Sequence, residues 1–237
     1  MNTHKRIDYR EDAGHERAVT AVFFDVDGVV VDSVVHKSAS LADLLVDDLG
    51  LDVAVDNLIG LNRRDKYDYL RKTTDVDISA EEFIRQYEAT LDGLYARDVT
   101  LLDGFPALLR DLRTVGIPVG LVSAGRMAQV ETVVERFDLE ELLDTVVTAD
   151  SIDGKSKPHP DLYERAAATL GIRVDRSIAV EDSEYGVLAA TRAGAYCIGY
   201  APPANPVQEL GAANEVVEGP AELRQAIDVR VGIDGDV

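Results

Sequence analysis

Cysteine and long apolar segments are almost absent from this chain of 237 residues. Its one cysteine, Cys197, lies in the apolar run AYCIGY, where we expect a buried structural thiol. A single cysteine excludes a disulfide framework and a thiolate metal site, which favours a reducing compartment. No apolar run approaches the roughly 18 residues of a transmembrane helix, and residues 1–18 lack the apolar core of a secretory signal. We therefore expect a cytoplasmic protein with no membrane partner.

Basic residues are also few. The chain has 24 lysines and arginines against 44 aspartates and glutamates, a net charge of −20, and only six of the basic residues are lysine. This negative charge repels a phosphate backbone, which excludes nucleic acid as a partner. The acid-rich, lysine-poor composition is similar to that of proteins from salt-loving organisms, in which high salt screens the self-repulsion of the surface. We therefore expect a halophilic protein.

The chain does contain enough apolar sequence for a substantial core. Hydrophobic residues make up 46% of it, and its length suffices for one large domain or two smaller ones. From residue 99 onward, short apolar segments alternate with segments of helical periodicity. This alternation predicts an α/β fold with a doubly wound, Rossmann-like parallel sheet. Residues 1–18, with mixed charge and few apolar positions, are expected to form a flexible tail.

Residues 34–98 interrupt the alternation with helical patterns alone. We expect one helix over 34–50, ended by Gly50, one over 63–73, and one over 79–98. Ser79 and Glu82 match a capping box at the start of the last of these. The pattern therefore divides the chain into an α/β core, residues 19–33 and 99–237, and an all-helical insert, residues 34–98.

The first expected strand is followed directly by two carboxylates. The apolar run at 22–24 suits a strand buried on both faces, and Asp25 and Asp27 follow at its carboxyl end, where open α/β sheets bind ligands. Gly28 then permits a tight turn. Two carboxylates this close repel each other unless a cation or a shared proton holds them. An ordinary Asp-Gly turn after a strand is the alternative interpretation.

Further polar groups stand at the ends of later strands or just beyond them. Ser123 ends the segment GLVS, Glu181 and Asp182 end AVED, and Lys157 precedes a helix that starts with proline. In a parallel sheet these ends face one edge, so we expect the groups to gather around Asp25. Each also has a structural alternative: Ser123 as a helix N-cap, Lys157 as a solvated charge, and Glu181 with Asp182 as a helix-capping pair.

Together these groups are typical of phosphoryl transfer. A nucleophilic Asp25 must approach a phosphorus surrounded by negative oxygens, so the site has to supply positive charge. Mg²⁺ on Asp25, the backbone carbonyl of Asp27 and Asp182, together with Lys157, would supply it. Asp27 would protonate the leaving oxygen and then activate water. The phosphoryl oxygens would be hydrogen-bonded by Ser123 and by the amides of Ala124 and Gly125.

In these stretches the chain resembles the haloacid dehalogenase (HAD) superfamily of phosphohydrolases. The matching stretches are DVDGVVVDS at 25–33, VSAG at 122–125, KPHPD at 157–161 and EDS at 181–183, in the order and at the spacings usual for that superfamily. The resemblance implies an aspartyl-phosphate on Asp25, acid–base work by Asp27, phosphate contacts from Ser123 and Lys157, and Mg²⁺ bound by Asp25, Asp27 and Asp182. Glu181 would be a partner of these ligands or would orient them.

The resemblance also implies a role for the helical insert. It falls where the superfamily carries a helical cap domain that excludes water and selects the substrate. The chain is most similar to the β-phosphoglucomutase and phosphoglycolate-phosphatase-like branch, whose cap carries a Gly-x-Ser/Thr-Arg type of loop, and GLNR at 60–63 occupies the matching place. Arg63, with Asn62 beside it, would bind a distal anionic group of the substrate. The alternative is an exposed arginine at a helix start.

The leading interpretation is a Mg²⁺-dependent phosphatase of a small phosphorylated metabolite, such as a sugar phosphate or phosphoglycolate, acting as a monomer or homodimer. The alternative is a β-phosphoglucomutase-like phosphotransferase, although Lys37 stands where the mutases carry histidine. Phosphonate cleavage through a Schiff base would need a cap lysine, for which Lys66 and Lys72 are the candidates. A non-enzymatic phospho-receiver module would take phosphate on an aspartate after the third strand, where Asp150 stands, but such modules lack a helical insert.

Overall fold

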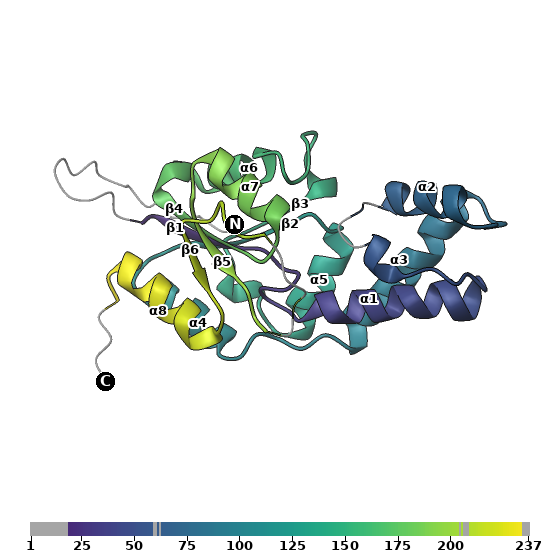
Figure 1. Ribbon diagram of the computed structural model, residues 1–237. Helices are drawn as coiled ribbons and strands as arrows, with labels where there is room; N and C mark the ends of the chain where they lie inside the picture. Colours follow the sequence, from purple (N-terminus) through teal and green to yellow (C-terminus); the bar gives the residue numbers. More distant parts are fainter. Residues whose placement is uncertain (1–18, 59–60, 62, 204, 206–208, 234–237) are drawn as a thin grey trace, which may run out of the picture.

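The computed structural model describes residues 19–58, 61, 63–203, 205 and 209–233 (Figure 1). Within these residues, six parallel strands form one sheet in the order β3-β2-β1-β4-β5-β6, with β1 in its middle. The strands are β1 (Ala21–Phe24), β2 (Val119–Ser123), β3 (Thr145–Thr148), β4 (Ser177–Glu181), β5 (Tyr196–Tyr200) and β6 (Glu215–Val217). The predicted α/β class with a doubly wound parallel sheet is confirmed.

Helices cover both faces of this sheet. Figure 1 shows α6 (Asp161–Leu170) and α7 (Glu184–Ala193) on one face, and α4 (Phe105–Thr114) and α8 (Pro220–Val231) on the other. Alternate residues of β1 supply the two cores. Ala21 and Phe23 pack in the core of α6 and α7, and Val22 and Phe24 pack in the core of α4, α8 and α5 (Met127–Arg136). Because both faces are buried, β1 is apolar throughout instead of alternating with polar residues.

The strand register aligns the carboxyl ends of the central strands. Phe24, the last residue of β1, pairs with residues of both β2 and β4. Asp25 follows it and donates its backbone N–H to the carbonyl of Val180 at 2.9 Å. Asp25 therefore stands at the same edge of the sheet as Ser123, which ends β2, and Glu181, which ends β4.

Helices α1 (Ser33–Asp43), α2 (Arg63–Thr73) and α3 (Ala80–Arg97) gather at one end of the molecule, beyond the sheet (Figure 1). The helix expected over 34–50 continues past α1 through a π-helical segment, Leu44–Asp48. Oγ of Ser79 accepts the amide of Glu82 at 3.2 Å, but the Glu82 carboxylate binds Arg85 instead of completing a capping box. The three helices occupy the predicted insert, and its division from the core at 34 and 98 remains a prediction.

The structure bears on two expectations drawn from composition, one about transmembrane helices and one about Cys197. In the part of the chain that the structure describes, no helix combines the length and the apolar character needed to cross a membrane. Cys197 lies in β5 and is fully buried, as expected. Burial, together with the charge of Glu181, raises the pKa of its thiol. Cys197 is thus a core residue rather than a nucleophile. The tail predicted at 1–18 lies outside the described residues.

Candidate active site

A buried lysine joins the first strand to the fourth at the carboxyl edge of the sheet. Nζ of Lys157 lies 2.6 Å from Oδ1 of Asp25 and 2.6 Å from Oε1 of Glu181, and donates to the carbonyl of Val122 at 2.9 Å. Its side chain is only 5% exposed, so the alternative of a solvated charge is wrong. Burial, the largest influence, lowers the pKa of Lys157, but the two carboxylates outweigh it and raise that pKa above its ordinary value.

Glu181 is completely buried between Lys157 and Tyr163 of α6. The Tyr163 hydroxyl donates to Oε1 of Glu181 at 2.5 Å, whereas Oε2 has no hydrogen-bond partner within the described residues. Burial raises the pKa of Glu181 to about 7, with the charge of Asp25 acting in the same direction and Lys157 against it. Glu181 therefore contacts the lysine that contacts Asp25, which fits the predicted orienting role.

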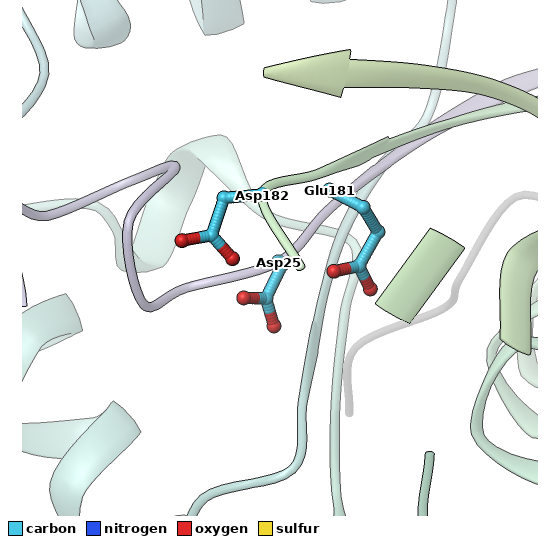
Figure 2. Close-up of side chains that lie close together, drawn as sticks. All are labelled: Asp25, Glu181 and Asp182. Carbon is cyan, nitrogen blue, oxygen red and sulfur yellow. The ribbon is translucent and has the colours of Figure 1, made fainter. Parts of the chain in front are cut away.

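Three buried carboxylates form a cluster at this edge. Asp25, Glu181 and Asp182 each offer an oxygen within 4.8 Å of the others, and Figure 2 shows Asp25 between Asp182 and Glu181. Burial and the charges of Asp25 and Glu181 raise the pKa of Asp182 well above its ordinary value. Burial, with the charge of Asp27 acting in the same direction, also raises the pKa of Asp25, although Lys157 lowers it. Repulsion among buried carboxylates is relieved by a cation, so this cluster could hold a metal ion.

Two glycines, which have no side chain, make room for the carboxylates of Asp182 and Glu181. A Cβ at Gly28 would lie 1.9 Å from Oδ2 of Asp182, and a Cβ at Gly186 would lie 1.7 Å from Oε2 of Glu181. Oδ2 of Asp182 also accepts a hydrogen bond from Nδ2 of Asn205 at 3.1 Å. The helix α7 is capped by the next residue, Ser183, whose Oγ accepts the amide of Gly186. The alternative in which Glu181 and Asp182 cap this helix is therefore wrong.

Asp27 has a separate set of partners, Ser33 and Lys37 of α1 and Tyr95 of α3. Its Oδ1 accepts hydrogen bonds from Ser33 Oγ at 2.5 Å and Tyr95 OH at 2.5 Å, and lies 2.7 Å from Nζ of Lys37. Burial, the largest influence, raises the pKa of Asp27, but Lys37 and these hydrogen bonds outweigh it and hold that pKa below its ordinary value. Its side chain is thus apart from the carboxylate cluster, and the backbone carbonyl stays the predicted ligand.

The loop after β2 lies next to Asp27. Ser123 is buried, and its Oγ accepts the amide of Gly125 at 2.9 Å. A Cβ at Gly125 would lie 3.9 Å from Oδ2 of Asp27. The amide of Gly125 is therefore engaged by Ser123, which leaves the Ser123 hydroxyl proton and the amide of Ala124 as the loop's candidate donors for a phosphate.

The first amide of α5 is satisfied by the segment that follows β3. The amide of Met127 donates to Oδ1 of Asp150 at 2.9 Å, and Asp150 also accepts from Thr148 Oγ1 at 2.7 Å. The interpretation of Ser123 as the N-cap of this helix is therefore wrong. Asp150, the aspartate that a phospho-receiver module would have phosphorylated, is a helix cap instead.

Of the predicted cap residues, Arg63 is described and Asn62 lies outside the described residues. Arg63 opens α2, and its Nε lies 3.1 Å from Oε1 of Glu88 in α3. Lys66 is buried and donates to the carbonyls of Leu58, at 2.7 Å, and Leu61. Burial, with the charges of Lys37 and Arg63, lowers its pKa to about 8. Its bonds to main-chain carbonyls fit a structural role for Lys66 better than a Schiff-base role.

Sequence reasoning missed four side chains that complete these contacts. They are the hydroxyls of Tyr95 and Tyr163, and the charged pair of Glu88 and Arg126. Tyr95 and Tyr163 stand at apolar positions of their helices, where helical spacing marks a tyrosine only as a core residue. Lys37 could be singled out from the sequence because it stands where the mutases carry histidine. Its contact with Asp27 was not predicted.

Comparison with known proteins places this arrangement in a family. The family model of the haloacid dehalogenase-like hydrolases matches residues 22–200. Hexitol phosphatase B of Escherichia coli (strain K12) is 30% identical over 183 residues, which cover 75% of this chain and 81% of that protein. Phosphoglycolate phosphatase of Shigella dysenteriae serotype 1 is 30% identical over 208 residues, covering 76% and 81%. Validoxylamine A 7′-phosphate phosphatase of Streptomyces hygroscopicus subsp. limoneus is 35% identical over 98 residues, which are 41% of this chain and 46% of that protein.

Solved structures agree with this result. A HAD family hydrolase of Deinococcus radiodurans, crystallised with phosphate and sodium, has a TM-score of 0.74 at 28% identity, covering 94% of this chain and all of that one. The β-phosphoglucomutase of Clostridium difficile has a TM-score of 0.72 at 23% identity, covering 90% and 97%, a likeness of fold. The prediction of an enzyme of the phosphatase kind is confirmed. The chain belongs to the haloacid dehalogenase-like hydrolase family, and it is similar in sequence to phosphoglycolate phosphatase and in fold to β-phosphoglucomutase.

Proposed function

We propose that this chain is a Mg²⁺-dependent phosphatase that hydrolyses a small phosphorylated metabolite through an aspartyl-phosphate on Asp25. The observation that carries the proposal is the contact of Lys157 with both Asp25 and Glu181, 2.6 Å each, beside the buried carboxylate of Asp182. A nucleophile, a fixed positive charge and metal-binding oxygens thus meet at the carboxyl edge of a parallel sheet.

The carboxylate cluster fits a hard divalent cation. Its donors are all oxygens, which Mg²⁺ prefers, and burial together with the neighbouring carboxylates raises the pKa of both Asp25 and Asp182, a repulsion that a cation relieves. Asp25, Asp182 and the backbone carbonyl of Asp27 would hold Mg²⁺, and Glu181 would orient Lys157. Bound there, the ion supplies positive charge to the phosphoryl oxygens in the transition state.

In the first step, a carboxylate oxygen of Asp25 attacks phosphorus, and the bond between phosphorus and the substrate oxygen breaks. Asp27, which takes up a proton as the substrate binds, gives that proton to the leaving oxygen. Its Oδ1 is fixed by three donors, while its Oδ2 faces the loop at Gly125. The nearby phosphoryl charge raises the pKa of Asp27 as the substrate binds, which allows this carboxylate to carry the proton.

In the second step, water attacks the phosphorus of the phosphorylated Asp25, and Asp27 takes a proton from that water. The bond between phosphorus and the Asp25 oxygen breaks, which releases inorganic phosphate and restores the carboxylate. Lys157, the Ser123 hydroxyl and the amide of Ala124 stabilise the phosphoryl oxygens in both steps. Asp27 can accept that proton because it gave up its own to the leaving oxygen in the first step.

The names of the relatives support a proposal for the substrate class. Hexitol phosphatase B and phosphoglycolate phosphatase are named for small phosphomonoesters, so we propose a sugar phosphate or a phosphoglycolate-like compound for this chain, in the cytoplasm and as a monomer or homodimer. A β-phosphoglucomutase-like phosphotransferase would instead convert β-glucose 1-phosphate without net phosphate release. Lys37, in the place of the mutases' histidine, lies against Asp27 and favours the phosphatase.

Removal of the metal tests the proposal. We expect the purified chain to release phosphate from small phosphomonoesters with Mg²⁺, and EDTA to reduce the rate by at least about 100-fold, because the buried carboxylates lose their cation. Added Mg²⁺ should restore activity, and without substrate it should raise the melting temperature, since it binds only the folded state. Asp182→Asn should lose that rise, whereas the exposed control Asp138→Asn should keep it. Full activity in EDTA, or isomerisation without phosphate release, would refute the proposal.

We also propose that the chain is adapted to high salt. Its net charge of −20 creates a self-repulsion that salt screens, so the melting temperature should rise steadily between low and molar KCl. The rise should shrink near the sequence isoelectric point of about 4.4, where little net charge remains to be screened. A melting temperature at pH 7 that does not respond to KCl would contradict the halophilic interpretation.

A further inference from the structure

A second charged cluster joins α3 to the loop after β2. Oε1 of Glu88 lies 3.1 Å from Nε of Arg63, and Oε2 of Glu88 lies 3.1 Å from Nη1 of Arg126. The same Nη1 is 3.9 Å from Oδ1 of Asp92, which accepts a hydrogen bond from Gln129 at 3.2 Å. Glu88 is thus the carboxylate shared by one arginine of the cap and one of the core.

This cluster lies within reach of a small substrate in the proposed active site. Arg126 follows directly after the loop of residues 123–125, which borders Asp27. On α3, Glu88 and Tyr95 are seven residues apart and so share one face, about 10 Å apart along the helix axis. The Tyr95 hydroxyl binds Asp27. A substrate whose phosphate is at Asp25 and whose other end lies along this face of α3 would meet Glu88.

The charge of the cluster determines which chemical groups it attracts at the far end of that substrate. Two arginines alone would attract a second anionic group. Here they face Glu88 and Asp92, so the formal charge of the four side chains is zero, and an added anion would also meet the carboxylate of Glu88. Nε of Arg63 is buried against Oε1 of Glu88, whereas the side chain as a whole is 32% exposed, so its terminal nitrogens are the donors that a substrate hydroxyl could meet.

We infer that Glu88 is a specificity-determining residue, which selects phosphomonoesters whose far end is uncharged and carries hydroxyls, against those with a second anionic group there. This inference rests on the proposed function and narrows its substrate class to sugar and polyol phosphates. Arg63, expected from the sequence to bind a distal anion, then serves as a hydroxyl donor whose charge Glu88 has already balanced.

The test compares two ligands that differ only in the second anion, a hexitol monophosphate and the corresponding hexitol bisphosphate. Binding is measured by calorimetry in the Asp25→Asn background with Mg²⁺, so that it does not depend on turnover. We expect the monophosphate to bind more tightly than the bisphosphate. Glu88→Gln should tighten the bisphosphate by about tenfold or more, because it adds one net positive charge, and should change the monophosphate less than about threefold.

Glu81→Gln, an exposed change in the first turn of α3, is the matched control and should alter neither affinity. The Glu88 ion pairs are 25–33% exposed, so their loss should not unfold the cap. Any of three results would overturn the inference. They are tighter binding of the bisphosphate than of the monophosphate by the chain with Glu88 intact, an equal effect of Glu88→Gln on both ligands, and no binding of either ligand. If both ligands bind as expected but the parent chain, with Asp25 intact, releases no phosphate, the proposed function is refuted and the inference about Glu88 is not.

Discussion

We expect Asp25→Asn to reduce phosphate release by on the order of 10⁴-fold or more, because the amide cannot form the phosphoryl-enzyme bond on which both steps depend. The fold should survive. Asparagine has the shape of aspartate, and the lost pairing with Lys157 is offset by reduced repulsion from Asp27 and Asp182. The variant should therefore remain folded and still bind phosphorylated ligands.

The measurement is phosphate release together with acid quenching of the enzyme after brief exposure to labelled substrate. The parent should retain covalent phosphate, and Asp25→Asn should not. Asp138→Asn is the matched control, because Asp138 is exposed and sits at a φ of 52°, a conformation that asparagine also tolerates. Equal rates for parent and Asp25→Asn would show that the nucleophile lies elsewhere.

The second large effect is expected from Lys157→Met, which should destabilise the metal-free protein by about 3–5 kcal/mol at pH 8 and abolish activity. The side chain of Lys157 is 5% exposed, and those of Asp25 and Glu181 are 8% and 0% exposed. Methionine keeps the length of the side chain but leaves two buried carboxylates without their positive partner.

The loss should depend on pH in a definite direction. With Lys157 present, the pKa of Glu181 is already raised to about 7, so stability from this group is present below its unfolded pKa and falls as the pH rises towards 7. Without the lysine, Glu181 and Asp25 hold their protons to still higher pH in the folded state. The deficit of the variant relative to the parent should therefore be small near pH 5 and grow towards pH 8.

Denaturant unfolding in EDTA at several pH values measures this deficit without a compensating cation. Lys155→Met is the control, since Lys155 is exposed two residues earlier, and its effect should stay within about 0.5 kcal/mol at every pH. A deficit that is independent of pH would show that Lys157 contributes packing rather than charge compensation.

The residues named from sequence alone lie close together because the end of a strand can be recognised from the local sequence, and a parallel sheet aligns these ends. Apolar runs ending in Asp25, Ser123 and Glu181 predicted buried parallel strands, and parallel strands bring such ends to one edge. Lys157 was found by its motif, but sequence could not distinguish a solvated lysine from a buried one. Burial depends on what packs over the side chain, and in this fold that includes Tyr163.

The partners of Asp27 show where sequence reasoning ends. Ser33 lies six residues away, but Tyr95 lies sixty-eight residues away on a helix of the insert. Which face of α3 meets the core depends on how three helices pack together, and helical periodicity gives only the apolar side. The same holds for Glu88, whose pairing with Arg126 joins the insert to the core.

By itself, the sequence determined the parallel α/β sheet, the helical composition of the insert and the identity of the groups at the sheet edge, because these follow from periodicity and from short motifs within single elements. Tertiary structure alone decided that Lys157 is buried between two carboxylates, that Glu181 rather than Asp27 completes the acidic cluster, and that Glu88 balances two arginines beside the site. Each of these depends on the distance between side chains from different elements, which packing sets and no local pattern records.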